Sequence, residues 1–431
     1  MRVREFILYR NFQRQDILDD FSALLEVENV TQEEAQVLRE KLSDVSHRLL
    51  RLADDFGFAG NLWHCFLAYL LCNNENPFSC ACEIRGHIEG SMNDFAMHDF
   101  GIFCELFSAD MEGLGEMLGT DVINVLLCYA PYKENGKAFN KRIRDRICEL
   151  AVKLAHAGSD DEFMEIVTGF YGDFGVGKFG LNKAFRVRHT EEGPVIEPIF
   201  NIRHVDLDDL VGYEKAKQQL IENTEAFIEG LPANNCLLYG DAGTGKSTSI
   251  KAIANRYYER GLRIIELYKH QFRDLNDVIA QIKNRNYKFI LYMDDLSFED
   301  FEVDYKYLKA VIEGGLEKKP ENILIYATSN RRHLIRESFR DKQERDEDLH
   351  TNDTVQEKLS LSARFGMSIY FGRPDQKEYH EIVRALAQRS GIEMDERELL
   401  LEADRWELRG AGKSGRTAEQ CIKNLSARLK K

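Results

Sequence analysis

The sequence predicts an α/β protein with a helical N-terminal domain, a core built on a parallel sheet, and a C-terminal helical lid. Residues 1–185 have helical character that only two prolines, Pro77 and Pro131, interrupt. The stretches at 288–293 and 323–330 have the length of buried strands. Two aspartates follow the first, and the second ends in polar residues, as expected where parallel strands end at one edge of a sheet. Three helical stretches then close the chain.

Four segments follow from these patterns. With 431 residues, the chain is long enough for two or three domains. A linker is expected where Pro194 and Pro198 occur without helical periodicity. The predicted segments are a helical N-terminal domain at 1–185, a linker at 186–205, a core at 206–372 and a lid at 373–431.

The composition, 43% hydrophobic and 30% charged, is typical of a globular chain that buries sizeable cores. The net charge of −15 argues against broad nonspecific binding to nucleic acid or to an anionic membrane, although a local basic patch stays compatible with it. The first ten residues contain an apolar run too short for a signal peptide, and His64 interrupts the most apolar stretch, 62–72. We therefore expect a cytoplasmic protein without membrane contact, whose nine scattered cysteines are mostly reduced.

The N-terminal domain is predicted to be a helical bundle. Thr31 and Glu34 form a capping box, which marks a helix start. An apolar stripe then repeats at alternating spacings of four and three residues: Leu38, Leu42, Val45, Leu49, Leu52 and Phe56. The stripe is shorter than a typical coiled coil, so it favours a bundle helix that faces a core. Further helices are expected at 62–71, 95–118, 139–156 and 160–170.

The stretch from Gly172 to Phe179 has the spacing of a phosphate-binding loop but lacks two of its features. Phe179 stands where Ser or Thr would bind Mg²⁺, and a helix rather than a strand is expected before the glycines. We interpret this stretch as a glycine-rich linker.

A second glycine-rich loop has both features. The spacing Gly240-x-x-x-x-Gly245-Lys246-Ser247 fits the P-loop pattern, in which backbone N–H groups and a helix N-terminus face phosphate. Lys246 would hold the β- and γ-phosphates of ATP, and Ser247 would bind Mg²⁺. The predicted contacts of this loop are Gly240, Asp241, Ala242, Gly243, Thr244, Gly245, Lys246, Ser247 and Thr248.

A Walker B strand is predicted at 288–293, because this apolar run ends in Asp294 and Asp295. The carboxyl ends of parallel strands meet at one edge of a sheet, so Asp294 is expected to reach the Mg²⁺ on Ser247. Asp294 and Ser247 are therefore the predicted metal ligands.

These motifs resemble the AAA+ superfamily of ATPases, and the resemblance implies further site residues. The segment 210–214 resembles the element that packs against adenine, which implies ATP contacts from Val211, Gly212 and Tyr213. Asn330 follows a strand that resembles sensor 1, which implies that it orients the attacking water.

AAA+ proteins usually place Glu directly after the Walker B aspartate to polarise that water. Asp295 stands at this position and is one methylene shorter. Asp295 is the favoured catalytic base, and Glu299 is the alternative.

Two arginines also match AAA+ elements. Arg364 lies in a segment that resembles the arginine-finger segment, with an unpaired structural role as the competing interpretation. Arg416 lies in a segment that resembles sensor 2 and would reach the γ-phosphate, with Lys413 as the substitute. A charge-rich insertion is expected at 337–358, and lid helices at 375–390, 395–408 and 417–429.

Three fragments, at 294–299, 327–335 and 414–416, are similar to a bacterial family of AAA+ ATP-binding proteins, domain of unknown function 815. The resemblance covers roughly the second half of the chain. The adjacent aspartates look like this family's own version of the Walker B motif.

The expected function is that of an AAA+ ATPase that binds and hydrolyses ATP with Mg²⁺ to change the conformation of a partner. The resemblance implies a homo-oligomer, and the N-terminal domain is expected to recognise an unidentified protein. The alternatives are a DNA-associated ATPase of the helicase-loader kind and a nonhydrolysing nucleotide switch. A protein-threading unfoldase is a weaker choice, because residues 268–272 lack an aromatic-hydrophobic-Gly pore loop.

Overall fold

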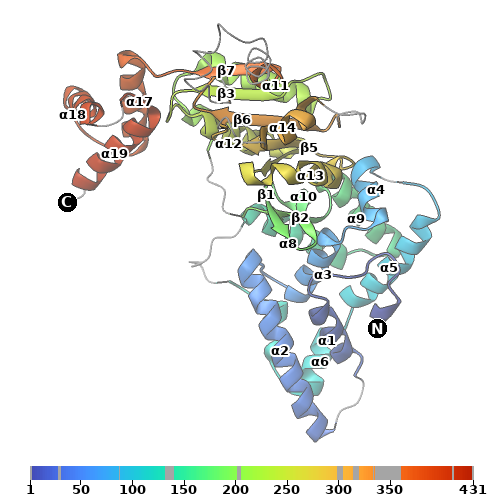
Figure 1. Ribbon diagram of the computed structural model, residues 1–431. Helices are drawn as coiled ribbons and strands as arrows, with labels where there is room; N and C mark the ends of the chain where they lie inside the picture. Colours follow the sequence, from blue (N-terminus) through green and yellow to red (C-terminus); the bar gives the residue numbers. More distant parts are fainter. Residues whose placement is uncertain are drawn as a thin grey trace. The chain divides into compact units, whose positions relative to one another are not determined.

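The computed structural model of the chain describes residues 2–27, 31–86, 88–131, 140–200, 205–298, 304–313, 320–332, 334, 361–409 and 412–429. It divides into two compact units, Met1–Asn182 and Lys183–Lys431 (Figure 1). The charge-rich segment expected at 337–358 lies outside the described residues.

The first unit is helical, as predicted. Its elements are η1 (Val3–Glu5), α1 (Gln15–Leu25), α2 (Gln32–Phe56), α3 (Leu62–Asn73), α4 (Pro77–Arg85), α5 (Met92–Phe107), α6 (Met111–Leu118), α7 (Val122–Leu127), α8 (Lys141–Ala155), α9 (Asp160–Phe174) and α10 (Gly177–Leu181). Helix α2 begins with the predicted capping box of Thr31 and Glu34. Its stripe is buried at Leu42, Val45 and Leu49 in the apolar cluster of this unit, as predicted for a bundle helix that faces a core.

Helix α3 is the centre of this unit, because it is apolar around most of its circumference and buried along most of its length. Trp63 is fully buried, stacks on Phe21 at 4.5 Å between ring centroids, and donates from Nε1 to the carbonyl of Leu106 at 3.0 Å. That hydrogen bond satisfies the polar atom of the indole inside the core. In the described part of the chain, no helix combines the length and the apolar content that a membrane crossing requires.

Two expectations for the first unit are corrected. The helix expected at 95–118 is broken into α5 and α6, because Asp110 accepts a hydrogen bond from Gly113 N at 2.8 Å and caps a new helix. The stretch from Gly172 to Phe179 is not a linker. Helix α9 continues into it, α10 follows, and Gly177 and Phe179 are buried.

The second unit is built on a seven-stranded sheet of order β2-β1-β4-β5-β6-β3-β7 (Figure 1). All neighbouring strands are parallel except β1 and β2. The strands are β1 (Ala184–Thr190), β2 (Gly193–Pro198), β3 (Cys236–Gly240), β4 (Leu262–Glu266), β5 (Lys288–Met293), β6 (Ile323–Ser329) and β7 (Met367–Phe371).

The hairpin of β1 and β2 corrects the expectation of a linker at 186–205. Residues 186–198 extend the sheet instead, since β1 pairs in parallel with β4 and antiparallel with β2. Pro194 and Pro198 lie on β2, which is the edge strand. An edge strand tolerates proline, because the missing N–H faces away from the ladder.

Both faces of the sheet are covered, so the central strands are almost wholly buried. Leu238, Ile290 and Leu324 share one apolar cluster with residues of α11 and α12. The remaining elements of this unit are η2 (Leu207–Asp209), α11 (Glu214–Ile228), α12 (Lys246–Tyr257), η3 (Tyr258–Arg260), η4 (Lys269–Asp274), α13 (Leu275–Ile282) and α14 (Asp304–Glu313).

Three helices after the sheet form the predicted lid. They are α17 (Gln376–Arg389), α18 (Glu396–Arg409) and α19 (Gly415–Leu429). They bury an apolar cluster of their own, which includes Tyr379, Ala403 and Ile422. The lid therefore has a separate small core.

Candidate nucleotide-binding site

The glycine-rich loop lies between β3 and α12, at the carboxyl edge of the sheet. Gly240 and Gly245 have φ angles of 136° and 96°, in the region that favours glycine. A Cβ atom would lie 2.1 Å from the carbonyl oxygen of Phe371 if added to Gly240, and 2.4 Å from Leu210 Cδ1 if added to Gly245. The loop conformation therefore requires glycine at both positions.

Lys246 is the first residue of α12, and only 6% of its surface is exposed. Its Nζ donates to the carbonyl oxygens of Gly240 at 2.9 Å and Asp241 at 2.6 Å, and to Asn330 Oδ1 at 3.2 Å. Burial lowers the pKa of Lys246, although nearby carboxylates oppose this effect. The ammonium is thus held inside the loop, at the place where a P-loop lysine meets phosphate.

The predicted metal ligands, Ser247 and Asp294, lie side by side. Ser247 Oγ donates to Asp294 Oδ1 at 2.6 Å, and Thr328 Oγ1 donates to the same oxygen at 2.6 Å. Partial desolvation by itself raises the pKa of Asp294, but these hydrogen bonds outweigh it, so the pKa lies below its ordinary value. A hydroxyl beside an ionised carboxylate offers the hard oxygen ligands that suit Mg²⁺.

Asp295 has a φ angle of 50°, which is unusual for a residue other than glycine. Its backbone N donates to Thr328 Oγ1 at 2.9 Å, and its Oδ1 accepts from Asn330 Nδ2 at 2.7 Å. Asn330 therefore links Lys246 to Asp295 through the two ends of its amide. The strained backbone directs this second carboxylate toward β6 while Asp294 faces Ser247.

Thr328 is a site residue that the sequence analysis missed. The parallel pairing of Met293 with Ala327 sets the next residues of both chain segments, Asp294 and Thr328, beside each other. One hydroxyl then donates to Asp294 and accepts from the backbone of Asp295. A threonine two positions before Asn330, at the polar end of an apolar strand, was the available signal.

The segment expected to contact adenine lies between the core and the lid. Gly212 and Tyr213 both have positive φ angles, of 79° and 60°. Tyr213 donates from its hydroxyl to the carbonyl of Gly372 at 3.0 Å, and burial raises its pKa to about 12. Val211 packs against the apolar cluster of the lid, so this segment contacts both parts.

The last lid helix begins at the loop. Arg416 N donates to the carbonyl of Gly243 at 3.3 Å, and a Cβ added to Gly243 would lie 3.0 Å from Arg416 Cβ. Arg416 is also close enough to lower the pKa of Lys246. Arg373, which lies just before the lid helices, also contacts the loop. Its backbone N donates to Asp241 Oδ2 at 3.2 Å, and its Nε donates to Asp241 Oδ1 at 3.1 Å.

Arg364 is not close to the loop of its own chain. It forms an ion pair with Glu313, the last residue of α14. It precedes β7, whose Met367 pairs with Cys236 and whose Phe371 pairs with Gly240. The P-loop therefore lies at the carboxyl edge of the sheet and Arg364 toward the amino edge, separated by about 13 Å of strand or more.

The other predicted residues have simpler positions. Thr244 is buried and donates from its hydroxyl to the carbonyl of Asp241 at 2.8 Å, which closes the loop turn. Ala242 lies in the loop, and Thr248 lies in the first turn of α12. Glu299, the alternative base, lies outside the described residues.

The loop, the paired aspartates after β5, Asn330 after β6 and the helical lid define a protein of the AAA+ class, whose P-loop fold binds nucleotide. The chain belongs to the family described as "Protein of unknown function (DUF815)", which matches residues 180–429.

More distant similarities are partial. Replication factor C large subunits are 37% identical over 81 residues in Staphylothermus marinus and 40% identical over 80 residues in Methanococcus maripaludis strain C7. Each match covers 19% of this chain and 18% or 16% of the relative, so the chain spans less than a fifth of either relative. The structure of the Thermotoga maritima RuvB Holliday junction branch migration motor is 19% identical, with a TM-score of 0.39, over 53% of this chain and 66% of that one.

Proposed function

We propose that this protein binds ATP with Mg²⁺ at the loop between β3 and α12 and hydrolyses it. The observation that carries this proposal is the connected set of side chains at the carboxyl edge. Ser247, Asp294 and Thr328 form one hydrogen-bonded group, and Lys246, Asn330 and Asp295 form the other. The two groups have the composition of a metal-binding half and a water-positioning half.

The chemistry at this site is the transfer of the γ-phosphoryl group of bound Mg–ATP to water. Lys246 exchanges its loop carbonyls for the β- and γ-phosphates, and Ser247 and Asp294 supply oxygen ligands to the metal. Asp295 accepts a hydrogen bond from the attacking water, while Asn330 fixes the orientation of that carboxylate. Arg416 offsets negative charge on the γ-phosphate from the lid.

We propose that ATP binding and hydrolysis act on a partner through movement of the lid and through assembly of several copies of the chain. Arg416 and Arg373 join the loop to the lid, so contacts to the phosphates are coupled to the position of the lid helices. Arg364 faces away from its own loop and is proposed to complete the site of a neighbouring copy. The N-terminal helical unit is proposed to recognise a protein partner in the cytoplasm.

Association with DNA is a second candidate, which the partial match to replication factor C large subunits favours. The net charge of −15 disfavours it unless basic residues gather locally. Binding of a DNA duplex that weakens steeply as salt is raised would support this candidate, because phosphate contacts release counterions. Negligible binding of the duplex at both low and high salt would rule out association with DNA.

A calorimetric titration with Mg–ATP tests the proposed site. Lys246→Ala should abolish measurable binding, because it removes the buried charge that meets the phosphates. The matched control is Lys178→Ala, which changes the corresponding lysine of the other glycine-rich stretch and should leave the ATP affinity intact. Unchanged affinity in Lys246→Ala would contradict the proposal, and phosphate release by the wild type separates an ATPase from a nonhydrolysing switch.

A further inference from the structure

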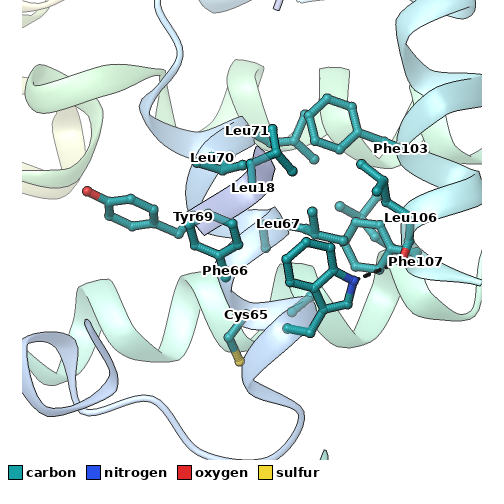
Figure 2. Packing of buried hydrophobic residues seen from close by; sticks show 14 of the residues in the cluster. Leu18, Cys65, Phe66, Leu67, Tyr69, Leu70, Leu71, Phe103, Leu106 and Phe107 are labelled. Atoms are coloured by element: carbon teal, nitrogen blue, oxygen red, sulfur yellow. Dashed lines mark hydrogen bonds between the residues drawn. The ribbon is translucent and has the colours of Figure 1, made fainter. Parts of the chain in front are cut away.

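Two cysteines of the helical unit lie next to each other. Cys65 Sγ on α3 and Cys148 Sγ on α8 are 3.8 Å apart. In Figure 2 the sulfur of Cys65 points away from the aromatic side chains that pack around Phe66 and Phe107. A disulfide has an S–S distance of about 2.05 Å, so closing the bond requires the two sulfurs to approach by about 2 Å.

The two thiols have different surroundings. Cys65 is 3% exposed and can also donate to the carbonyl of Ala59 at 3.6 Å, whereas Cys148 is only partly buried. The contact with Cys65 lowers the pKa of Cys148, and Arg144 acts in the same direction. The same sulfur contact, together with burial, raises the pKa of Cys65. Cys148 is therefore the more exposed thiol and the one that ionises more readily, and Cys65 is the buried thiol beside it.

We propose that Cys65 and Cys148 form a peroxide-reactive dithiol site that closes to an intramolecular disulfide. The Cys148 thiolate attacks one oxygen of hydrogen peroxide, the O–O bond breaks, and Cys148 becomes a sulfenic acid. The departing hydroxide takes up the proton that the Cys148 thiol released on ionisation and forms the first water. The sulfur of Cys65 then attacks the sulfenic sulfur, the S–O bond breaks, and the departing hydroxide takes the Cys65 proton to form water. Two thiols are oxidised, and one peroxide is reduced to two waters.

The disulfide would connect α3 to α8 across 83 residues of chain, since 148 − 65 = 83. These helices pack against each other in the same core, so the bond joins elements that are already neighbours. A crosslink over a long loop restricts the unfolded chain, which raises the thermal midpoint of the helical unit. The site thus makes the stability of this unit depend on the oxidation state of two thiols.

The test treats the reduced full-length chain with hydrogen peroxide, blocks the remaining thiols with an alkylating reagent, and maps the peptides without reduction. We expect a linked pair of peptides containing Cys65 and Cys148, lighter than the sum of the two thiol peptides by two hydrogen atoms. Cys148→Ser should abolish the linked pair, and Cys128→Ser, which changes an exposed cysteine, should retain it. The midpoint of the wild type should rise on oxidation and fall back with dithiothreitol.

Cys65→Ser should also abolish the linked pair. Because a serine at this buried position can destabilise the core, the folding of this variant is checked by circular dichroism. If Cys65→Ser is unfolded, Cys148→Ala takes its place, since Cys148 is only partly buried. Oxidised wild type in which both cysteines are alkylated singly, with no linked pair, would overturn the proposal. A linked pair that persists in Cys128→Ser and disappears in Cys148→Ala would support it.

Discussion

Thr328 holds the two aspartates of the candidate site in different orientations. Its hydroxyl donates to Asp294 Oδ1 at 2.6 Å and accepts from Asp295 N at 2.9 Å. The first contact stabilises the ionised form of Asp294 beside Ser247, and the second supports the positive φ angle of Asp295. One side chain therefore connects the half of the site that is proposed to bind metal to the half that is proposed to position water.

Thr328→Val should lower ATP turnover by about tenfold or more, because losing a hydrogen bond to a charged group costs about 1.5–3 kcal/mol. Thr328→Ser is the matched control, since it keeps the hydroxyl and should keep most of the activity. Phosphate release at saturating Mg–ATP measures both variants. Equal turnover in Thr328→Val and Thr328→Ser would show that the hydroxyl does not organise the aspartates.

At the scale of elements, two glycine-rich stretches that share the same spacing of glycines and lysine adopt different structures. The loop at 240–247 follows a buried strand, whereas the stretch at 172–179 follows α9 and leads into α10. Gly177 has a φ angle of 68°, and a Cβ added to it would lie 1.9 Å from Glu75 Oε1. The side chain of Glu75 thus lies against the second stretch, and the burial of Val176 in the apolar cluster makes that stretch part of the helical core.

Gly177→Ala should destabilise the helical unit by about 1–2 kcal/mol, which is the cost of a side chain in the left-handed region. The exposed side chain of Glu75 is flexible and can move aside at little cost. Gly169→Ala is the control, because Gly169 lies inside α9 with open space around it, and alanine should stabilise the helix by about 0.5–1 kcal/mol. Urea unfolding measures both, and equal stability of the two variants would contradict this account of Gly177.

Elements with a strong local pattern were predictable from sequence. The apolar run at 288–293 and β5 have the same bounds, and Thr31 begins α2 through the capping box. The hairpin at 184–198 was not predictable in this way, because its prolines are tolerated only by virtue of the edge position of β2. Thr328 was missed for a related reason, since its contact with Asp294 depends on the register between two strands distant in sequence.

At the scale of the whole molecule, the P-loop and Arg364 lie toward opposite edges of the same sheet. One copy of the chain therefore cannot bring this arginine to its own loop without unfolding β7. A second copy could present its arginine to the loop of the first. The ion pair with Glu313 leaves the side chain anchored at its own end of the sheet.

A mixing experiment tests this role of Arg364. Arg364→Ala should bind ATP normally and lose turnover, because arginine fingers supplied in trans contribute about 10³ to 10⁵ in rate. Lys246→Ala should not bind ATP but keeps Arg364, so a mixture of the two variants should recover activity that neither has alone. No recovery, although light scattering shows that mixed oligomers form, would identify Arg364 as a structural partner of Glu313.

Phosphate release by Asp295→Asn tests most directly whether the site hydrolyses ATP through the carboxylate of Asp295. Asparagine keeps the size of the side chain but cannot accept a proton from water. We expect this variant to bind Mg–ATP with the affinity of the wild type and to release phosphate far more slowly. Wild-type turnover in Asp295→Asn, with loss of turnover in Glu299→Gln, would show that Asp295 is not the base and would assign that role to Glu299.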